Sequence, residues 1–270
     1  MPVEDSMRSL EAVIAALPGA IVAYSGGADS AFLAEMANQV LGRRAMAVTA
    51  DSPSLPRREL RAAAELARQR GWQHQIVETF ELEDGRYAAN PVDRCYFCKS
   101  ALFDRLRPLS DSLGVPVCLG TNTDDLSEWR PGQRAASDRG ARHPLVEAGL
   151  SKAAVREASR AIGLPCADKP AAACLASRFA YGVRVTKEGL GRIEFAEEAL
   201  LGQGFSVVRV RDLGADRARV EVGREEVARL LDLEGLVRAR LEGLGFAEVV
   251  LDERGYRPGA LNEGLGLVAH

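Results

Sequence analysis

The sequence contains no apolar run as long as the roughly 20 residues that a membrane-spanning helix needs. It also lacks excess positive charge, since 35 Lys and Arg face 38 Asp and Glu for a formal net charge of −3. The first absence argues against a membrane partner, and the second against binding nucleic acid through bulk positive charge. Glycine and proline follow no triplet period, and a hydrophobic content of 47% is ordinary for a globular chain, which excludes collagen and disorder.

A disulfide framework and a secretory signal are also missing. The five cysteines, at positions 95, 98, 118, 166 and 174, are an odd number. The amino-terminal stretch is acidic before it is apolar, the reverse of a signal peptide. We therefore expect reduced thiols in a cytoplasmic protein.

Most of the chain alternates short apolar runs with helix-prone segments. The predicted strands are 20–24, 45–50, 74–79 and 115–120, and the helices among and after them include 57–70, 99–113 and 151–163. This order predicts an α/β fold with a doubly wound parallel sheet. Ligands of such sheets bind at the carboxyl ends of the strands, where the segments SGGADS, TADS and GTNTDD follow.

The pattern changes near residue 184. A helix over 187–203 precedes two alternating strands, a helix over 224–242 and a last strand, FAEVVLD. We predict two domains, a nucleotide-binding domain over 1–182 and a smaller α+β domain over 183–270.

SGGADS follows a strand and opens a helix, so its backbone N–H groups can close on a phosphate at the helix N-terminus. Ser25, Gly26 and Gly27 have small side chains or none, so they leave room for a phosphate near the backbone. Ser30 offers a hydroxyl to the phosphate, and Asp29 can bind Mg²⁺. The motif lacks the Gly-Lys-Ser/Thr of the Walker loop. It resembles the PP-loop of the ATP pyrophosphatases, which implies an adenine nucleotide α-hydrolase-like fold and cleavage of ATP between the α and β phosphates.

The cysteines divide into two groups. Cys95 and Cys98 form a CxxC pair, which by itself fits a redox pair, half a zinc site or two buried thiols. Together with Cys174, three thiolates and one open position suit a [4Fe–4S] cluster better than zinc. Cys118 and Cys166 have no partner pattern, and we interpret both as structural.

Seven segments in order make the chain similar to the LarE family over nearly its whole length. They are SGGADS, VTADSPSLPRREL, NPVDRCYFCK, GTNTDDLSEWRPG, KPAAACLASRFAYGVRVT, RVR and GYRPGALN. The family comprises the ATP-dependent sulfurtransferases of nickel-pincer nucleotide cofactor biosynthesis. Other PP-loop enzymes share only the first segment.

This resemblance implies a substrate, pyridinium-3,5-biscarboxylic acid mononucleotide, and the cofactors ATP and Mg²⁺. One carboxylate is adenylated, pyrophosphate leaves, and the sulfur that replaces AMP comes through Cys174. Either the Cys174 thiol is sacrificed and becomes dehydroalanine, or a [4Fe–4S] cluster on Cys95, Cys98 and Cys174 supplies the sulfur. The resemblance also implies a homo-oligomer, a hexamer built as a trimer of dimers.

Further site residues are expected where strands end and where arginines gather. Asp51, Ser52, Gly120, Thr121 and Asp125 are expected to bind the nucleotide. Arg178, Arg209 and Arg211 are expected to hold the anionic substrate, with Arg178 also next to Cys174. Glu194, Glu198 and Glu221 are carboxylates that can bind metal or orient an arginine.

Two alternatives remain open. One is a PP-loop tRNA thiolation enzyme, which would need a basic face that the slightly acidic small domain lacks. The other is a nucleotide-binding or sulfur-carrier protein without turnover, which the intact SGGADS and Cys174 disfavour.

Overall fold

The structure is a computed structural model that describes residues 3–127, 131–170 and 173–257. The parts of the expected family segments at 128–130, 171–172 and beyond 257 lie outside the described residues. The chain forms two compact units, Met1–Glu81 with Cys95–Ala172, and Leu82–Arg94 with Ala173–His270. The division at 182/183 stays a prediction.

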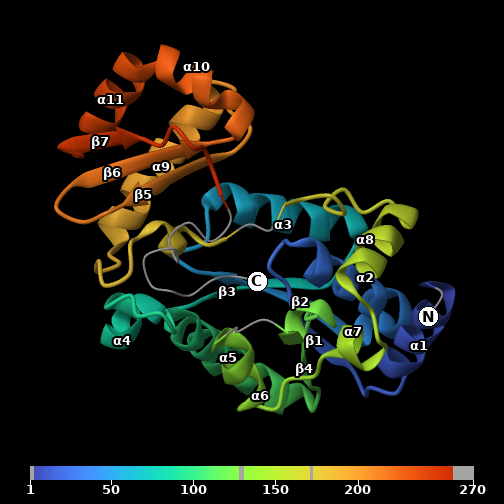
Figure 1. Ribbon diagram of the computed structural model, residues 1–270. Coiled ribbons are helices and arrows are strands. Elements are labelled where there is room, and N and C mark those ends of the chain that lie inside the picture. Colours follow the sequence, from blue (N-terminus) through green and yellow to red (C-terminus); the bar gives the residue numbers. More distant parts are fainter. Residues whose placement is uncertain (1–2, 128–130, 171–172, 258–270) are drawn as a thin grey trace. The chain divides into compact units, whose positions relative to one another are not determined.

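The first unit is built on a four-stranded parallel sheet with the order β3-β2-β1-β4 (Figure 1). Its strands are β1 (Ala20–Ala23), β2 (Ala45–Asp51), β3 (His74–Glu78) and β4 (Val117–Leu119). Its helices are α1 (Val3–Ala15), α2 (Ala28–Leu41), α3 (Arg57–Arg70), α5 (Arg94–Leu113), α6 (Pro131–Ser137), α7 (Pro144–Glu147) and α8 (Lys152–Ala161). Short 3₁₀ turns lie at Gly42–Arg44, Glu81–Glu83 and Asp124–Ser127.

Apolar residues on both faces of this sheet are buried under helices. Ala20, Val22 and Ala47 belong to a core shared with α1, α2, α3 and α8. Ile21 and Val48, their neighbours along the strands, belong to a second core with α5 and α6. The alternation of side chains along a strand explains why these apolar runs are continuous. The predicted α/β fold with a doubly wound parallel sheet is confirmed.

The strand order places β1 at a change of direction, because the chain leaves β1 for β2 on one side and returns with β4 on the other. The segments after β1 and β4 therefore meet at the carboxyl edge of the sheet, where such folds bind ligands.

The second unit contains a three-stranded mixed sheet, β5-β6-β7, and confirms the smaller α+β unit. β5 (Val208–Asp212) runs antiparallel to β6 (Arg217–Val222), and β6 runs parallel to β7 (Glu248–Leu251). The other elements are α4 (Gly85–Ala88), 3₁₀ turns at Leu175–Arg178 and Arg224–Glu226, α9 (Lys187–Gly202), α10 (Val227–Asp232) and α11 (Glu234–Glu242). One face of the sheet packs on α9, α10 and α11 around Val210, Val220 and Phe246.

Two helices differ from expectation. The helix expected over 99–113 begins at Arg94, so the CxxC pair lies in its first turn. The helix expected over 224–242 is interrupted at Leu233, which separates α10 from α11. Within the described residues, no helix combines the length and the apolar character that crossing a membrane requires.

Candidate active site

The loop between β1 and α2 is closed by its own hydroxyls. Ser30 Oγ lies 3.1 Å from both the backbone nitrogen and the Oγ of Ser25, and donates to the Gly27 carbonyl. Gly26 adopts a φ of +77°, which favours glycine. Gly27 caps α2 without a side-chain hydrogen bond. The first N–H groups of α2 are thus available to an anion.

Gly120, directly after β4, lies against this loop. A Cβ on Gly120 would stand 2.7 Å from the Ser30 nitrogen and 2.8 Å from the Asp29 carbonyl carbon. Only glycine permits this approach, which brings the expected residues Gly120 and Thr121 beside the expected phosphate loop. Thr121 is 9% exposed.

Two carboxylates occupy the same edge. Asn122 Nδ2 lies 3.4 Å from Asp29 Oδ1, and Asp125 Oδ2 accepts the backbone N–H of Asn122. Burial and the nearby Asp125 carboxylate raise the pKa of Asp29, while Asn122, Lys152 and Arg156 oppose that shift. The carboxylates of Asp29 and Asp125 form an oxygen-rich edge suited to Mg²⁺.

Lys169 supports the loop from the other side, a role that sequence reasoning missed. Its Nζ lies 2.5 Å from Glu59 Oε2 and 3.5 Å from the Gly26 carbonyl. Ala63 of α3 would contact a Cβ on Gly26 at 3.2 Å. α3 and Lys169 therefore hold the loop in the conformation that Gly26 requires.

The residues after β2 are engaged within the protein. Asp51 forms an ion pair with Arg57, whose Nη2 donates to the Ser52 carbonyl at 2.6 Å. The Ser52 hydroxyl donates to Glu81 and accepts the Ser54 N–H. Glu81 is 1% exposed, and its other carboxylate oxygen has no partner among the described residues. Glu81 is a second residue that sequence reasoning missed, because no motif contains it.

Cys174, in the second unit, is half-buried and precedes the turn Leu175–Arg178. Arg178 Nη1 donates to the carbonyls of Ala173 at 2.8 Å and Cys174 at 3.2 Å. Its Nε and Nη2 bind the two carboxylate oxygens of Glu197 at 2.8 and 3.1 Å. The Arg178 side chain therefore anchors the backbone around the Cys174 thiol.

Glu197 was missed from sequence, where Glu198 was expected. Glu197 is buried on the apolar stripe of α9 that also contains Ile193, Ala196 and Leu200, and this spacing was the available signal. It accepts the Val210 N–H of β5 as well. Glu198 is half-buried on the same helix.

The two arginines of β5 share one face of the strand, as expected, but differ in their contacts. Arg211 is bound by Glu221, at 2.8 Å from Nη2 to Oε2, and donates to the Ser177 carbonyl. Arg209 stacks on Tyr256, with 5.1 Å from Cζ to the ring centroid, and no described carboxylate lies within ion-pair distance. Burial and the Arg178 guanidinium lower the pKa of Arg209. Arg209 Nη1 donates to the Val208 carbonyl at 2.7 Å, and the guanidinium has the chemistry to bind an anion as well.

Comparison with known proteins identifies the family. The chain is 34% identical over 259 residues, 95% of its length and 94% of the relative's, to pyridinium-3,5-bisthiocarboxylic acid mononucleotide synthase of Lactiplantibacillus plantarum. The chain belongs to the LarE family of ATP-dependent sulfurtransferases.

Two other relatives have no assigned function. An uncharacterized protein of Synechocystis sp. is 44% identical over 96% of this chain and 97% of its own length. An uncharacterized protein of Methanocaldococcus jannaschii is 25% identical over 88% of this chain and 90% of its own length. No family model matches the chain.

For a LarE-family chain, the place of the CxxC pair bears on the sulfur source. Cys95 is exposed and Cys98 half-buried, and both lie in the first turn of α5, so two thiols are present near each other on one helix. Arg94, the preceding residue, donates to the Ala176 carbonyl at 2.9 Å within the second unit. In the part of the chain that the structure describes, no three His, Cys, Asp or Glu side chains gather as a metal site.

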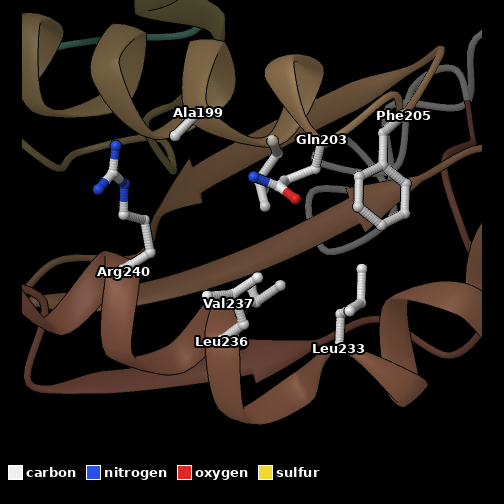
Figure 2. Close-up of a pocket in the computed structure, with 8 residues that line it drawn as sticks. Ala199, Gln203, Phe205, Leu233, Leu236, Val237 and Arg240 are labelled. Atoms are coloured by element: carbon white, nitrogen blue, oxygen red, sulfur yellow. The ribbon is translucent and has the colours of Figure 1, made fainter.

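Cys118 and Cys166 are buried, and the second unit contains an apolar pocket. Burial raises the pKa of the Cys118 thiol to about 12 and also raises that of Cys166, which fits the structural interpretation of both. A pocket of about 140 Å³ in the second unit lies between α9 and α11 and contains none of the expected site residues (Figure 2). Its lining residues are Ala199, Leu200, Gln203, Phe205, Leu233, Leu236, Val237 and Arg240.

Proposed function

We propose that this chain transfers sulfur to pyridinium-3,5-biscarboxylic acid mononucleotide in an ATP-dependent reaction that yields a thiocarboxylate. The observation that carries the proposal is the closed loop Ser25–Ser30 with the Asp29 and Asp125 carboxylates at its edge. The product in the name of the Lactiplantibacillus plantarum relative, a bisthiocarboxylic acid mononucleotide, supplies the substrate class.

ATP activates the carboxylate, because an oxygen of a free carboxylate is a poor leaving group. The substrate carboxylate attacks the α-phosphorus, pyrophosphate leaves, and an acyl adenylate forms. The N–H groups at the start of α2 would bind the departing pyrophosphate, and Mg²⁺ held by Asp29 and Asp125 would neutralise its charge.

Sulfur then replaces AMP on the acyl carbon. In the sacrificial route, the Cys174 thiolate attacks the carbonyl, AMP leaves, and a thioester joins the substrate to the protein. Loss of the Cα proton to solvent and cleavage of the Cβ–Sγ bond leave the sulfur on the substrate and dehydroalanine at residue 174. The contacts of Arg178 with the Ala173 and Cys174 carbonyls would fix the thiol for this attack.

The alternative sulfur source is a [4Fe–4S] cluster held by Cys95, Cys98 and Cys174, and the chemistry of the CxxC pair fits two of its ligands. When bound, such a cluster would supply a sulfide and spare the cysteine. The substrate's phosphate would bind Arg209 of β5, which has no described carboxylate within ion-pair distance.

The test is the intact mass of anaerobically purified protein before and after reaction with ATP, Mg²⁺ and substrate, with iron and acid-labile sulfide measured on the same sample. Loss of one H₂S mapped to Cys174, with thiocarboxylate formed and no iron, selects the sacrificial route. Unchanged mass with iron, sulfide and thiocarboxylate selects the cluster route. Absence of both pyrophosphate and thiocarboxylate would refute the proposed function.

A further inference from the structure

Helix α9 exposes a phenylalanine to solvent. The Phe195 side chain is 64% exposed, more than any other large apolar side chain in the described part of the chain. The apolar side chains of Leu190, Ile193 and Leu200 lie on the buried face of α9, and Phe195 lies outside that face. The core of the second unit therefore does not account for Phe195, whose ring would release free energy if a partner covered it.

The pocket between α9 and α11 begins one turn further along the same helix (Figure 2). Ala199, one turn after Phe195, forms part of its wall, and the buried side chains of Leu200, Phe205 and Val237 line its interior. The volume of the pocket is about 140 Å³. An apolar cavity of about 150 Å³ takes up benzene, so this pocket has the size and the chemistry to hold one phenyl ring.

The charges around the pocket and around Phe195 are complementary. The Arg240 guanidinium lies at the Ala199 end of the pocket, away from Phe205 (Figure 2). Glu198, one turn after Phe195 on α9, is half-buried and places a carboxylate beside the exposed ring. An apolar centre with charges at its rim is the usual arrangement of a protein–protein interface.

We infer that Phe195 of one copy of this chain fills the pocket of a second copy, while the partner's Phe195 fills the pocket of the first. Because the ring and the pocket lie on the same helix, a two-fold axis near Ala199 exchanges them, and each contact is made twice. The small side chain of Ala199 lets the two α9 helices approach, and Glu198 of each copy comes near the cation at the rim of the other. The sequence predicts a homo-oligomer without a surface for it, and these observations do not depend on that prediction.

The experiment measures the mass of the full chain in solution by sedimentation velocity over a range of protein concentrations. Phe195→Ser removes the ring, and Ala199→Trp fills the pocket from its wall. Leu113→Ser removes a similarly exposed apolar side chain from the end of α5 in the first unit, so it is the matched control. The unfolding temperature of each variant verifies that it is folded.

We expect wild type to associate. Phe195→Ser and Ala199→Trp should each need at least about 100-fold more protein to reach the wild-type mass, because either substitution removes two buried aromatic contacts from the pair. Leu113→Ser should match wild type. A monomeric wild type, wild-type association of Phe195→Ser, or an equal loss in Leu113→Ser would overturn the inference.

A mixture of the two α9 variants separates direct contact from a structural effect. In a pair of one Phe195→Ser chain and one Ala199→Trp chain, the remaining phenyl ring enters the open pocket. The added indole occupies the space that the other ring has left. Each variant alone should therefore dissociate, and the equimolar mixture should associate nearly as wild type does. A mixture of folded variants that stays dissociated would contradict the exchange of rings and leave the pocket to another occupant.

Discussion

Arg178 and Glu197 form a fully buried ion pair, each with 2% of its side chain exposed, and the remaining donors of Arg178 hold the backbone around Cys174. An ion pair so deep contributes little net stability when complete. Instead, the pair fixes the position of the turn Leu175–Arg178, which follows the Cys174 thiol.

Removal of one partner of this ion pair should therefore lower the free energy of unfolding much more than removal of both partners. We expect Glu197→Ala to lower the free energy of unfolding by about 3–5 kcal/mol, because it leaves the Arg178 charge buried and uncompensated. The double variant Arg178→Met, Glu197→Leu should recover most of that loss.

The same double variant separates structure from function. It should release pyrophosphate in the presence of ATP and substrate but form thiocarboxylate at least about tenfold more slowly. The reason is that a displacement of the nucleophile by about 1 Å strongly lowers the rate of the reaction. Thermal unfolding, a pyrophosphate assay and mass spectrometry of the product measure the three quantities. Sulfur transfer at the wild-type rate would contradict the anchoring role.

Gly120 supports a second prediction, since a Cβ there would collide with backbone atoms of Ser30 and Asp29. A flexible side chain can change its rotamer to avoid a new methyl group, but backbone atoms cannot. Gly120→Ala should therefore displace the phosphate loop. We expect ATP-dependent pyrophosphate release to fall by roughly tenfold or more.

The matched control is Gly191→Ala in α9, where nothing lies within 4 Å of the added Cβ. That variant should keep its activity and gain about 0.5–1 kcal/mol from helix propensity. Unchanged nucleotide chemistry in Gly120→Ala would remove Gly120 from the site.

The strands and the loops after them were predictable because burial on two faces imposes continuous apolar runs, as in Ala20–Ala23. The helix over Arg57–Arg70 was predicted to the residue because Gly71 ends it in a left-handed conformation. Contacts between distant segments were not predictable in this way. Glu81 and Lys169 lie in no motif, and only the tertiary fold brings them to Ser52 and Gly26.

Asp29 yields a pH prediction. Its folded pKa is raised above the unfolded value of about 3.9, so the folded state holds this proton more tightly. The associated stability is present below that unfolded value and is lost as pH rises through the raised folded pKa. At neutral pH the metal-free protein thus carries an unfavourable charge, which Mg²⁺ would neutralise.

Two measurements follow from this sign. Mg²⁺ should raise the unfolding temperature more at pH 7 than at pH 4, and Asp29→Asn should remove most of that difference. The variant should be at least as stable as wild type without metal at pH 7, yet release pyrophosphate roughly 100-fold more slowly. Normal pyrophosphate release by Asp29→Asn would refute its assignment.

Arg209 has no described carboxylate within ion-pair distance, in contrast to Arg211, which Glu221 binds. If Arg209 holds the phosphate of the substrate, Arg209→Ala should raise the KM for the substrate by about 10- to 100-fold, as loss of a charge-assisted hydrogen bond of about 1.5–3 kcal/mol implies. The KM for ATP should change little.

Arg217→Ala, at an exposed position at the start of β6, is the control and should leave both constants unchanged. A larger effect on ATP than on substrate would move Arg209 to the nucleotide site. Loss of folding in Arg209→Ala would instead assign the stacking on Tyr256 a structural role, which Arg209→Lys distinguishes because it keeps the charge without the planar guanidinium.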